Sequence, residues 1–203
     1  IKSTDEHYVS EKTTFVQLSP RMGYFVANNL VVGGGAYNKT QFSKEIMLID
    51  DSLPFIPNYL WVLFTYNNIY NIDEPFSFYI NEPYATMLGN NPLAIFSLEI
   101  ENNPQLLFTE TFQNLVLNQG DHPMVDAIAD NNRYDWSPES SVYMMHGKQD
   151  NFVFPSNATS AYEAMSAAGQ NENITLNLLD NSNHFHAAAV FSITLHQILT
   201  TFR

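Results

Sequence analysis

The sequence predicts an α/β fold, in which helices pack on a parallel sheet and a mainly helical insert separates two of the strands. Short apolar runs over residues 141–146 and 174–179 are each followed by a helix-periodic segment. Strand, helix, strand, helix is the pattern of a parallel βαβ unit. Residues 40–130 instead hold seven of the ten prolines, which exclude long strands and long helices from most of this stretch.

The 203 residues are enough for one domain of ordinary size, or for part of a larger one. We expect residues 1–39 to form a lead-in and one core strand of the sheet domain. Residues 40–130 are expected to form a cap insert, mainly helical, and residues 131–203 the carboxyl-terminal α/β core. This division follows from the change in proline content and from the regular pattern that begins near residue 131.

The first part of the chain is weakly patterned, with a short strand expected over residues 14–18. A core strand over residues 29–32 runs into three consecutive glycines, which predict a strand-end turn. We reject a nucleotide-binding loop here, because Asn38 stands where a dinucleotide fingerprint needs glycine and no Gly-Lys-Ser/Thr follows.

The two carboxyl-terminal helices are predicted from apolar spacing. The first begins near Ser156 and ends at Gly169, which supplies a stop signal. The second carries an apolar stripe expected to pack on the sheet, formed by Ala188, Phe191, Leu195, Ile198 and Phe202.

The aromatic segments of the insert have two interpretations. One is a hydrophobic core that belongs to the insert itself. The other is a cap whose inner face lines an apolar substrate pocket. The two interpretations are compatible.

Composition excludes several classes of function. Eight Lys and Arg against 21 Asp and Glu give a net charge of −13, which repels nucleic acid and anionic membrane surfaces. The absence of cysteine excludes disulfides, thiolate metal sites and a cysteine nucleophile. The apolar runs are too short to span a bilayer, so no transmembrane segment is expected.

An acid and a base follow consecutive predicted strands. The run over residues 141–146 ends in His146 and Gly147 and delivers Asp150 into the next loop, and the run over residues 174–179 is followed by His184. Open α/β sheets place their chemistry at the carboxyl ends of the strands. If these strands are parallel neighbours, Asp150 and His184 meet.

Other interpretations of these residues remain open. Asp150 on its own also fits a cap for its loop or for the following helix. His184 and His186 form His-x-His, which on an extended segment would share a face and bind a metal with Asp150 or Asp180. Alternative acids, none of which follows a strand, are Asp126, Asp130 and Asp135. Histidines expected to have structural or surface roles are His7, His122, His146 and His196.

Three motifs give the chain a resemblance to a known family: His146-Gly147-Lys148-Gln149-Asp150 with Val153 and Pro155 behind it, the helix ending in Ala167-Ala168-Gly169, and His184-Phe185-His186-Ala187-Ala188. They resemble the carboxyl-terminal half of an α/β-hydrolase of the esterase, lipase and peptidase superfamily. Residues 132–138, and the strand that runs into Gly35-Ala36-Tyr37-Asn38, are similar to a secreted-lipase-like branch with a helical cap. The resemblance covers residues 131–202 well and residues 30–130 more loosely.

By position, the resemblance implies that Asp150 is the acid and His184 the base of a catalytic triad whose nucleophile is serine. We expect no cofactor and no bound metal. The nucleophile motif Gly-x-Ser-x-Gly does not occur in the sequence, and Ser10 and Ser19 lack the flanking glycines. We therefore expect the serine upstream of this chain, within an amino-terminal half that is missing or lies on another polypeptide. The alternative is a protein that has lost its nucleophile.

The resulting prediction is a serine-type hydrolase that acts on a small-molecule ester with an apolar acyl or alcohol group. The main alternative is a non-catalytic binding or scaffolding module with the same fold. The sequence does not identify the substrate-binding residues. An exported location is favoured slightly over the cytoplasm.

Overall fold

The computed structural model describes residues 23–26, 29–89, 91–138, 140–168 and 173–201. The chain divides into two compact units. The sheet unit combines Ile1–Asn38 with Asn132–Arg203, and the helical unit is Lys39–Asn131. Each unit is described by itself below.

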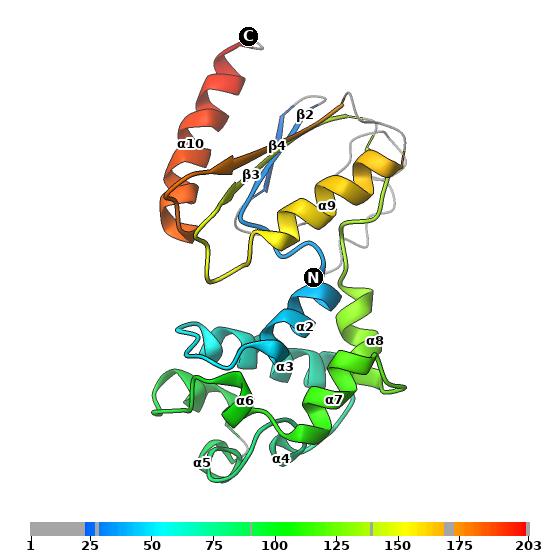
Figure 1. Cartoon of the computed structure of the whole chain (residues 1–203), viewed down its shortest axis with the longest axis vertical. Helices are drawn as coiled ribbons and strands as arrows, with labels where there is room; N and C mark the ends of the chain where they lie inside the picture. The colour runs from blue at the N-terminus through cyan, green and yellow to red at the C-terminus, as the bar shows by residue number, and fades with distance from the viewer. Residues whose placement is uncertain (1–22, 27–28, 90, 139, 169–172, 202–203) are drawn as a thin grey trace. The chain divides into compact units, whose positions relative to one another are not determined.

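The sheet unit contains a four-stranded sheet in the order β1-β2-β3-β4, of which β2, β3 and β4 are labelled in Figure 1. Its strands are β1 (Gly23–Val26), β2 (Asn29–Gly33), β3 (Ser141–Gly147) and β4 (Ile174–Leu179). Strands β2, β3 and β4 run parallel, as predicted for an α/β fold, whereas β1 pairs antiparallel with β2. The sequence did not predict β1. The strand expected over residues 14–18 lies outside the described residues.

The register of β3 sends alternate side chains to opposite faces of the sheet. Val142 and Met144 belong to a buried cluster on one face, while Met145, with Tyr143 packed beside it, belongs to a cluster on the other. Met144 is paired with Val32 of β2. Because successive strand residues point to opposite faces, a shift of one residue would move each of these apolar side chains to the wrong face.

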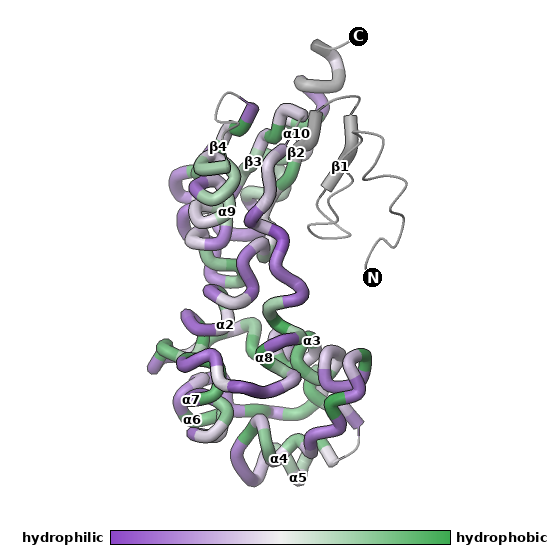
Figure 2. The backbone as a smooth tube through the Cα atoms, turned by 90° about the vertical axis from the view of Figure 1, so that its right-hand side faces the viewer, coloured by the Kyte–Doolittle hydropathy of each residue, from purple (hydrophilic) through white to green (hydrophobic). Residues whose placement is uncertain are grey.

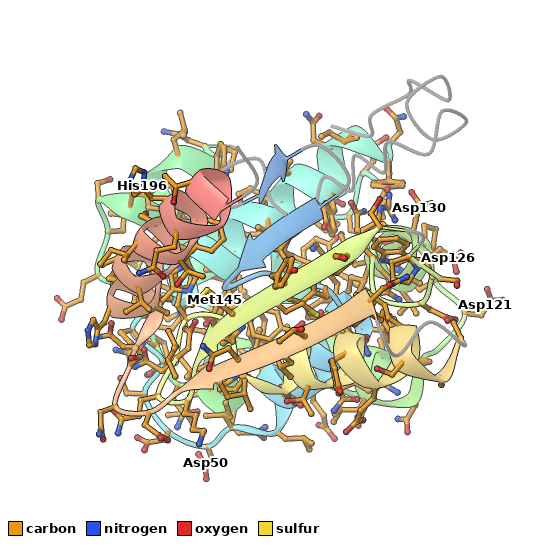
Figure 3. All side chains as sticks on the ribbon, turned by 90° about the horizontal axis from the view of Figure 1, so that it is seen from above. Asp50, Asp121, Asp126, Asp130, Met145 and His196 are labelled. Atoms are coloured by element: carbon orange, nitrogen blue, oxygen red, sulfur yellow. The ribbon has the colours of Figure 1, made fainter. Side chains whose placement is uncertain are left out.

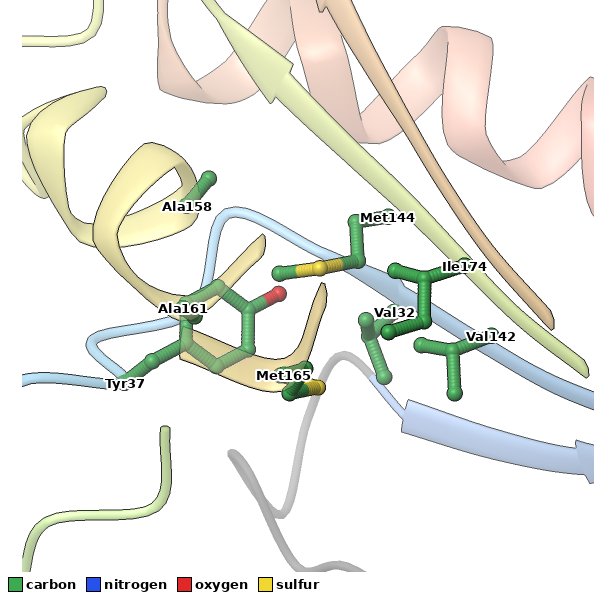
Figure 4. Close-up of a cluster of buried hydrophobic side chains, with 8 residues drawn as sticks. All are labelled: Val32, Tyr37, Val142, Met144, Ala158, Ala161, Met165 and Ile174. Atoms are coloured by element: carbon green, nitrogen blue, oxygen red, sulfur yellow. The ribbon is translucent and has the colours of Figure 1, made fainter. Parts of the chain in front are cut away.

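Helix α9 (Ser156–Ala167) packs on the first face. Small side chains of α9 allow it to lie close to the sheet, and Tyr37 fills the remaining space (Figure 4). The buried members of this cluster are Val32, Tyr37, Val142, Met144, Ala158, Ala161, Met165 and Ile174. Gly169, expected to end this helix, lies outside the described residues.

Helix α10 (His184–Thr201) covers the opposite face, and Figure 3 shows α9 and α10 on the two sides of the strands. Phe191 and Leu195 of the expected apolar stripe pack against Met145. A Cβ atom added to Gly33 would lie 2.9 Å from the Phe191 ring, so the glycine at the end of β2 allows this helix to approach. The side chain of Ile198 and the residue Phe202 lie outside the described part of the chain.

The helical unit consists of short helices, as the proline spacing predicts. They are α2 (Lys39–Leu48), α3 (Ile56–Ile69), α4 (Phe76–Tyr79), α5 (Tyr84–Leu88), the 3-10 helix η1 (Pro92–Phe96), α6 (Pro104–Leu107), α7 (Glu110–Asn118) and α8 (Pro123–Asp130). Prolines lie at or beside the start of α3, α4, α5, η1, α6 and α8. The N–H groups in the first turn of a helix have no hydrogen-bond partner within the helix. Proline, which has no N–H group, is therefore tolerated there.

The helical unit has a hydrophobic core of its own. Tyr79 and Phe112 are buried, with ring centroids 5.1 Å apart, and Phe64 stacks on Phe76 at 4.0 Å. Hydrophobic and hydrophilic segments alternate along its tube in Figure 2, which is the pattern expected of helices that bury one side. Among the described helices, none combines the length and the hydropathy that a membrane crossing requires.

Candidate active site

The loops that follow β3 and β4 are held together by backbone hydrogen bonds. Lys148 N–H donates to the Leu179 carbonyl at 3.0 Å, and Gln149 N–H donates to the Ser182 carbonyl at 2.9 Å. A Cβ atom added to Gly147 would lie 2.3 Å from the same Ser182 oxygen. The glycine after His146 is therefore what allows the two loops to approach each other.

Asp150 lies in the first of these loops, and its side chain is buried. One carboxylate oxygen, Oδ1, accepts hydrogen bonds from the backbone N–H groups of Phe152 and Val153, each at 2.9 Å. The other, Oδ2, lies 2.7 Å from His184 Nδ1. Asp150 thus caps its own loop with one oxygen and contacts the imidazole with the other, so the structure brings together the acid and the base that the sequence paired.

His184 is the first residue of α10. The Asn183 side chain accepts a hydrogen bond from His186 N–H at 2.9 Å, which is the geometry of a helix N-cap. The Phe152 ring contacts the imidazole edge-on, with centroids 4.9 Å apart. The His184 side chain is 14% exposed to solvent. Because Nδ1 faces an ionised carboxylate, it is the nitrogen that donates a proton, and Nε2 lies on the opposite side of the ring.

The electrostatics of the pair keep Asp150 ionised. Burial alone would raise the pKa of this carboxyl group, but hydrogen bonds from His146, His184 and the Val153 backbone, with the charge of His184, lower it more. The net effect holds the Asp150 pKa well below its usual range. The group is therefore a carboxylate at neutral pH, which is the state that fixes a histidine tautomer.

His146 contacts the same carboxylate, which the sequence did not predict. Its side chain is fully buried, and Nε2 lies 3.2 Å from Asp150 Oδ2 and 2.7 Å from the Val153 carbonyl oxygen. The sequence assigned His146 a structural role at a strand end. The contact with Asp150 depends on the loop folding back to Val153, a turn that the Asp150 side chain closes.

The basis of the metal-binding alternative is wrong. His184 and His186 lie in the first turn of α10 and not on an extended segment, so they do not share a face. His186 Nδ1 is 3.4 Å from the Ser182 hydroxyl, and Asp180 binds Lys148 at 2.7 Å on the surface. Within the described residues, no group of three or more His, Cys, Asp or Glu is placed to hold a metal ion.

None of the three alternative acids follows a strand. Asp126 and Asp130 belong to α8 of the helical unit, and Asp130 accepts a hydrogen bond from the Tyr70 hydroxyl at 2.5 Å. Asp135 is exposed in the segment before β3. Helix α8 and the segment that holds Asp135 both precede β3, so none of the three acids lies in a loop after β3 or β4.

The remaining histidines have other environments. His122 Nδ1 caps α8 by accepting a hydrogen bond from Met124 N–H at 3.1 Å. His196 is exposed on α10 (Figure 3). His7 lies outside the described residues, as do the two upstream serines, Ser10 and Ser19.

The helical unit contains a cavity of about 520 Å³. Three carboxylates, Asp73, Glu74 and Glu82, line it together with Phe76 and Ala85. The lining of this cavity is mainly polar.

Comparison with solved structures identifies the fold. A presumed hydrolase from Legionella pneumophila superposes with a TM-score of 0.71 at 18% identity over 95% of this chain. Two structures of the rice cell-wall-degrading esterase LipA from Xanthomonas oryzae, one of them a variant, superpose with TM-scores of 0.69 and 0.60 at 18% and 16% identity over 85% of this chain. No family model and no curated protein matches the sequence. The chain has an α/β-hydrolase-like fold.

The chain spans only about half the length of these structures. It covers 53% of the Legionella protein and 50% and 48% of the two LipA structures. The likeness is therefore one between this chain and a part of each larger protein.

Proposed function

We propose that this chain is the carboxyl-terminal part of a serine-type hydrolase that acts on an ester, with His184 as general base and Asp150 as its orienting acid. The observation that carries the proposal is the 2.7 Å contact between Asp150 Oδ2 and His184 Nδ1. The α/β-hydrolase-like fold supports it, because the two residues follow neighbouring parallel strands at the edge where such folds place their chemistry. The LipA structures are those of an esterase, which favours an ester as the bond attacked.

In the proposed reaction, His184 Nε2 removes the proton from a serine hydroxyl as the oxygen attacks the ester carbonyl. Asp150 holds the Nδ1–H tautomer and stabilises the imidazolium that forms. His184 then gives this proton to the departing alcohol. Water, activated by the same imidazole, hydrolyses the acyl enzyme. Positioned general-base catalysis of this kind contributes about 10²–10⁴-fold to the rate.

The nucleophile is proposed to come from residues encoded upstream of this chain. The 203 residues contain no Gly-x-Ser-x-Gly motif, and the chain matches about half of the larger hydrolase-like structures. In α/β-hydrolases the triad occurs in the order Ser, Asp or Glu, then His. Asp150 before His184 agrees with the last two places of that order, which leaves the serine to the amino-terminal side.

The substrate is proposed to be a small ester with an apolar acyl or alcohol group. The net charge of −13 disfavours an anionic substrate. The competing proposal, a non-catalytic binding module, keeps the same fold and requires no serine. The two differ in whether a reactive nucleophile exists.

A fluorophosphonate probe on the full-length protein, with the upstream residues included, separates these proposals. The serine enzyme is labelled on one serine, and His184→Ala reduces the labelling rate at least about 10²-fold, because the base is gone. His196→Ala, an exposed histidine on the same helix, serves as the matched control and keeps the normal rate. A folded full-length protein that resists labelling, or one that is labelled equally well without His184, would exclude the proposed mechanism.

A further inference from the structure

His146 has a hydrogen-bonding arrangement that fixes its protonation. Its Nε2 lies 2.7 Å from the Val153 carbonyl oxygen and 3.2 Å from Asp150 Oδ2. Both oxygens act only as acceptors, since the carboxylate is ionised. Nε2 therefore carries the proton and shares it between the two oxygens.

The Asp150 carboxylate has close donors around both of its oxygens. Oδ1 receives the N–H groups of Phe152 and Val153, and Oδ2 receives the Nδ1–H group of His184. His146 Nε2 lies 3.2 Å from the same Oδ2. Both imidazoles therefore face the same oxygen, and each partly neutralises its negative charge.

The other nitrogen of His146 makes a purely structural role less satisfactory. Nδ1 is buried and, among the described residues, has no hydrogen-bond partner. A buried polar atom without a partner destabilises the folded state. An apolar side chain of similar size would avoid that penalty, so the favourable contribution of the histidine lies on its Nε2 side.

We propose that His146 is a positioning residue that acts on His184 through Asp150. His146 donates a proton towards the Asp150 oxygen that also accepts the hydrogen bond from His184, and this reduces the negative charge on that oxygen. The hydrogen bond between Asp150 and the Nδ1 proton of His184 is weaker as a result. The inference rests on the proposed function of the Asp150–His184 pair. It extends that function by assigning a third residue, fully buried on β3, to the control of the base.

The surroundings contain few other charges that would have the same effect. Among the described residues, the titratable side chains in contact with Asp150 are His146 and His184. Lys148 and Asp180 pair with each other at the surface at 2.7 Å. The low Asp150 pKa is consistent with this arrangement, because the hydrogen bond from His146 is one of its causes.

The test compares two substitutions in the full-length protein by NMR. His146→Leu removes the donor, whereas His146→Gln keeps an N–H group near the position of Nε2. The reporter is the Nδ1 proton of His184, which resonates far downfield when it is bound to a carboxylate. We expect this resonance to move further downfield in the leucine variant and to stay in place in the glutamine variant. The Asp150 carboxyl pKa, followed by ¹³C NMR, should rise by roughly one unit in the leucine variant alone.

Asp150→Asn separates failure of this inference from failure of the proposed pair. If that substitution abolishes the downfield proton while His146→Leu leaves the proton and the Asp150 pKa unchanged, the role of His146 is overturned and the pair stands. If Asp150→Asn leaves the proton in place, both are overturned.

A measurement on the unmodified chain remains decisive if the leucine variant does not fold. The ¹⁵N shifts of the His146 ring should identify Nε2 as the protonated nitrogen and Nδ1 as the bare one at neutral pH. A ring protonated on Nδ1 with a bare Nε2 has no proton to donate to Asp150, and it would overturn the inference without any substitution.

Discussion

Replacing Gly147 with alanine tests why the loops after β3 and β4 meet. The added Cβ atom would lie 2.3 Å from the Ser182 carbonyl oxygen, 2.8 Å from its carbonyl carbon and 2.9 Å from the Asn183 carbonyl oxygen. These are backbone atoms and have no rotamer by which to move aside. Ordinary contact begins at 3.4 Å, so the segment that carries His184 has to retreat by about 1 Å.

Two effects follow from that retreat. Overpacking of this kind lowers the free energy of unfolding by about 1–3 kcal/mol. A displacement of 1 Å in a catalytic group reduces the rate by about 10²-fold. We therefore expect Gly147→Ala to lower both the urea midpoint of the chain and the ester hydrolysis rate of the full-length protein.

Gly120→Ala is the matched control. There the added Cβ would lie 2.7 Å from Leu115 Cδ1, the far end of a flexible side chain that can rotate away. This substitution should change stability much less than Gly147→Ala and leave the hydrolysis rate unaltered. If the two alanine variants behave alike in both assays, the explanation given for Gly147 is incorrect.

Three further predictions concern stability measured by urea unfolding. The folded-state pKa of Asp150 is depressed, so its contribution to stability is fully present above the unfolded pKa of about 4 and is lost as the pH falls from there towards the folded value. Asp150→Asn should therefore show a shallower loss of stability below about pH 4 than the unmodified protein. An equally steep loss would contradict this. Asn183→Ala removes the side chain that accepts the His186 N–H and should cost about 0.5–2 kcal/mol, with Asn183→Ser restoring most of it. Met144→Ala, in the core between β3 and α9, should cost about 2–5 kcal/mol, whereas the exposed Leu48→Ala should cost little; equal effects would mean that Met144 is not packed as described.

The parallel part of the fold was predictable because its signals are local. The runs that form β3 and β4 are apolar, short and separated by a helix-periodic segment, and these features alone predict parallel neighbours. Strand β1 has only four residues, and its antiparallel pairing with β2 is a tertiary feature that four residues do not specify. The insert was predictable as helical because its prolines permit short helices.

The candidate site was predictable only in part. Asp150 and His184 each follow a strand, so parallel pairing was sufficient to predict that they meet. The contact of His146 with the carboxylate arises from the turn at Val153, whose N–H binds Oδ1 while its carbonyl accepts from the imidazole. That turn is closed by Asp150 itself, an Asx-type motif that was not used to place His146 near the carboxylate.

The start of α10 shows a signal that was overlooked. His184 and His186 were placed on an extended segment in the metal-binding alternative, but the helix begins at His184. Asn183 is a good N-cap residue, and it stands directly before the segment. Taken as a cap, it would have put both histidines in the first turn and removed the shared face that a metal site needs.

The most direct test of the central proposal is the rate at which the full-length protein hydrolyses a small ester after Asp150→Asn. An amide at this position keeps the size of the side chain but can no longer hold His184 in the Nδ1–H tautomer as an anion does, so kcat should fall by about 10⁴-fold. A variant that folds normally and retains more than about a tenth of the original kcat would contradict the assignment of Asp150 and His184 as acid and base.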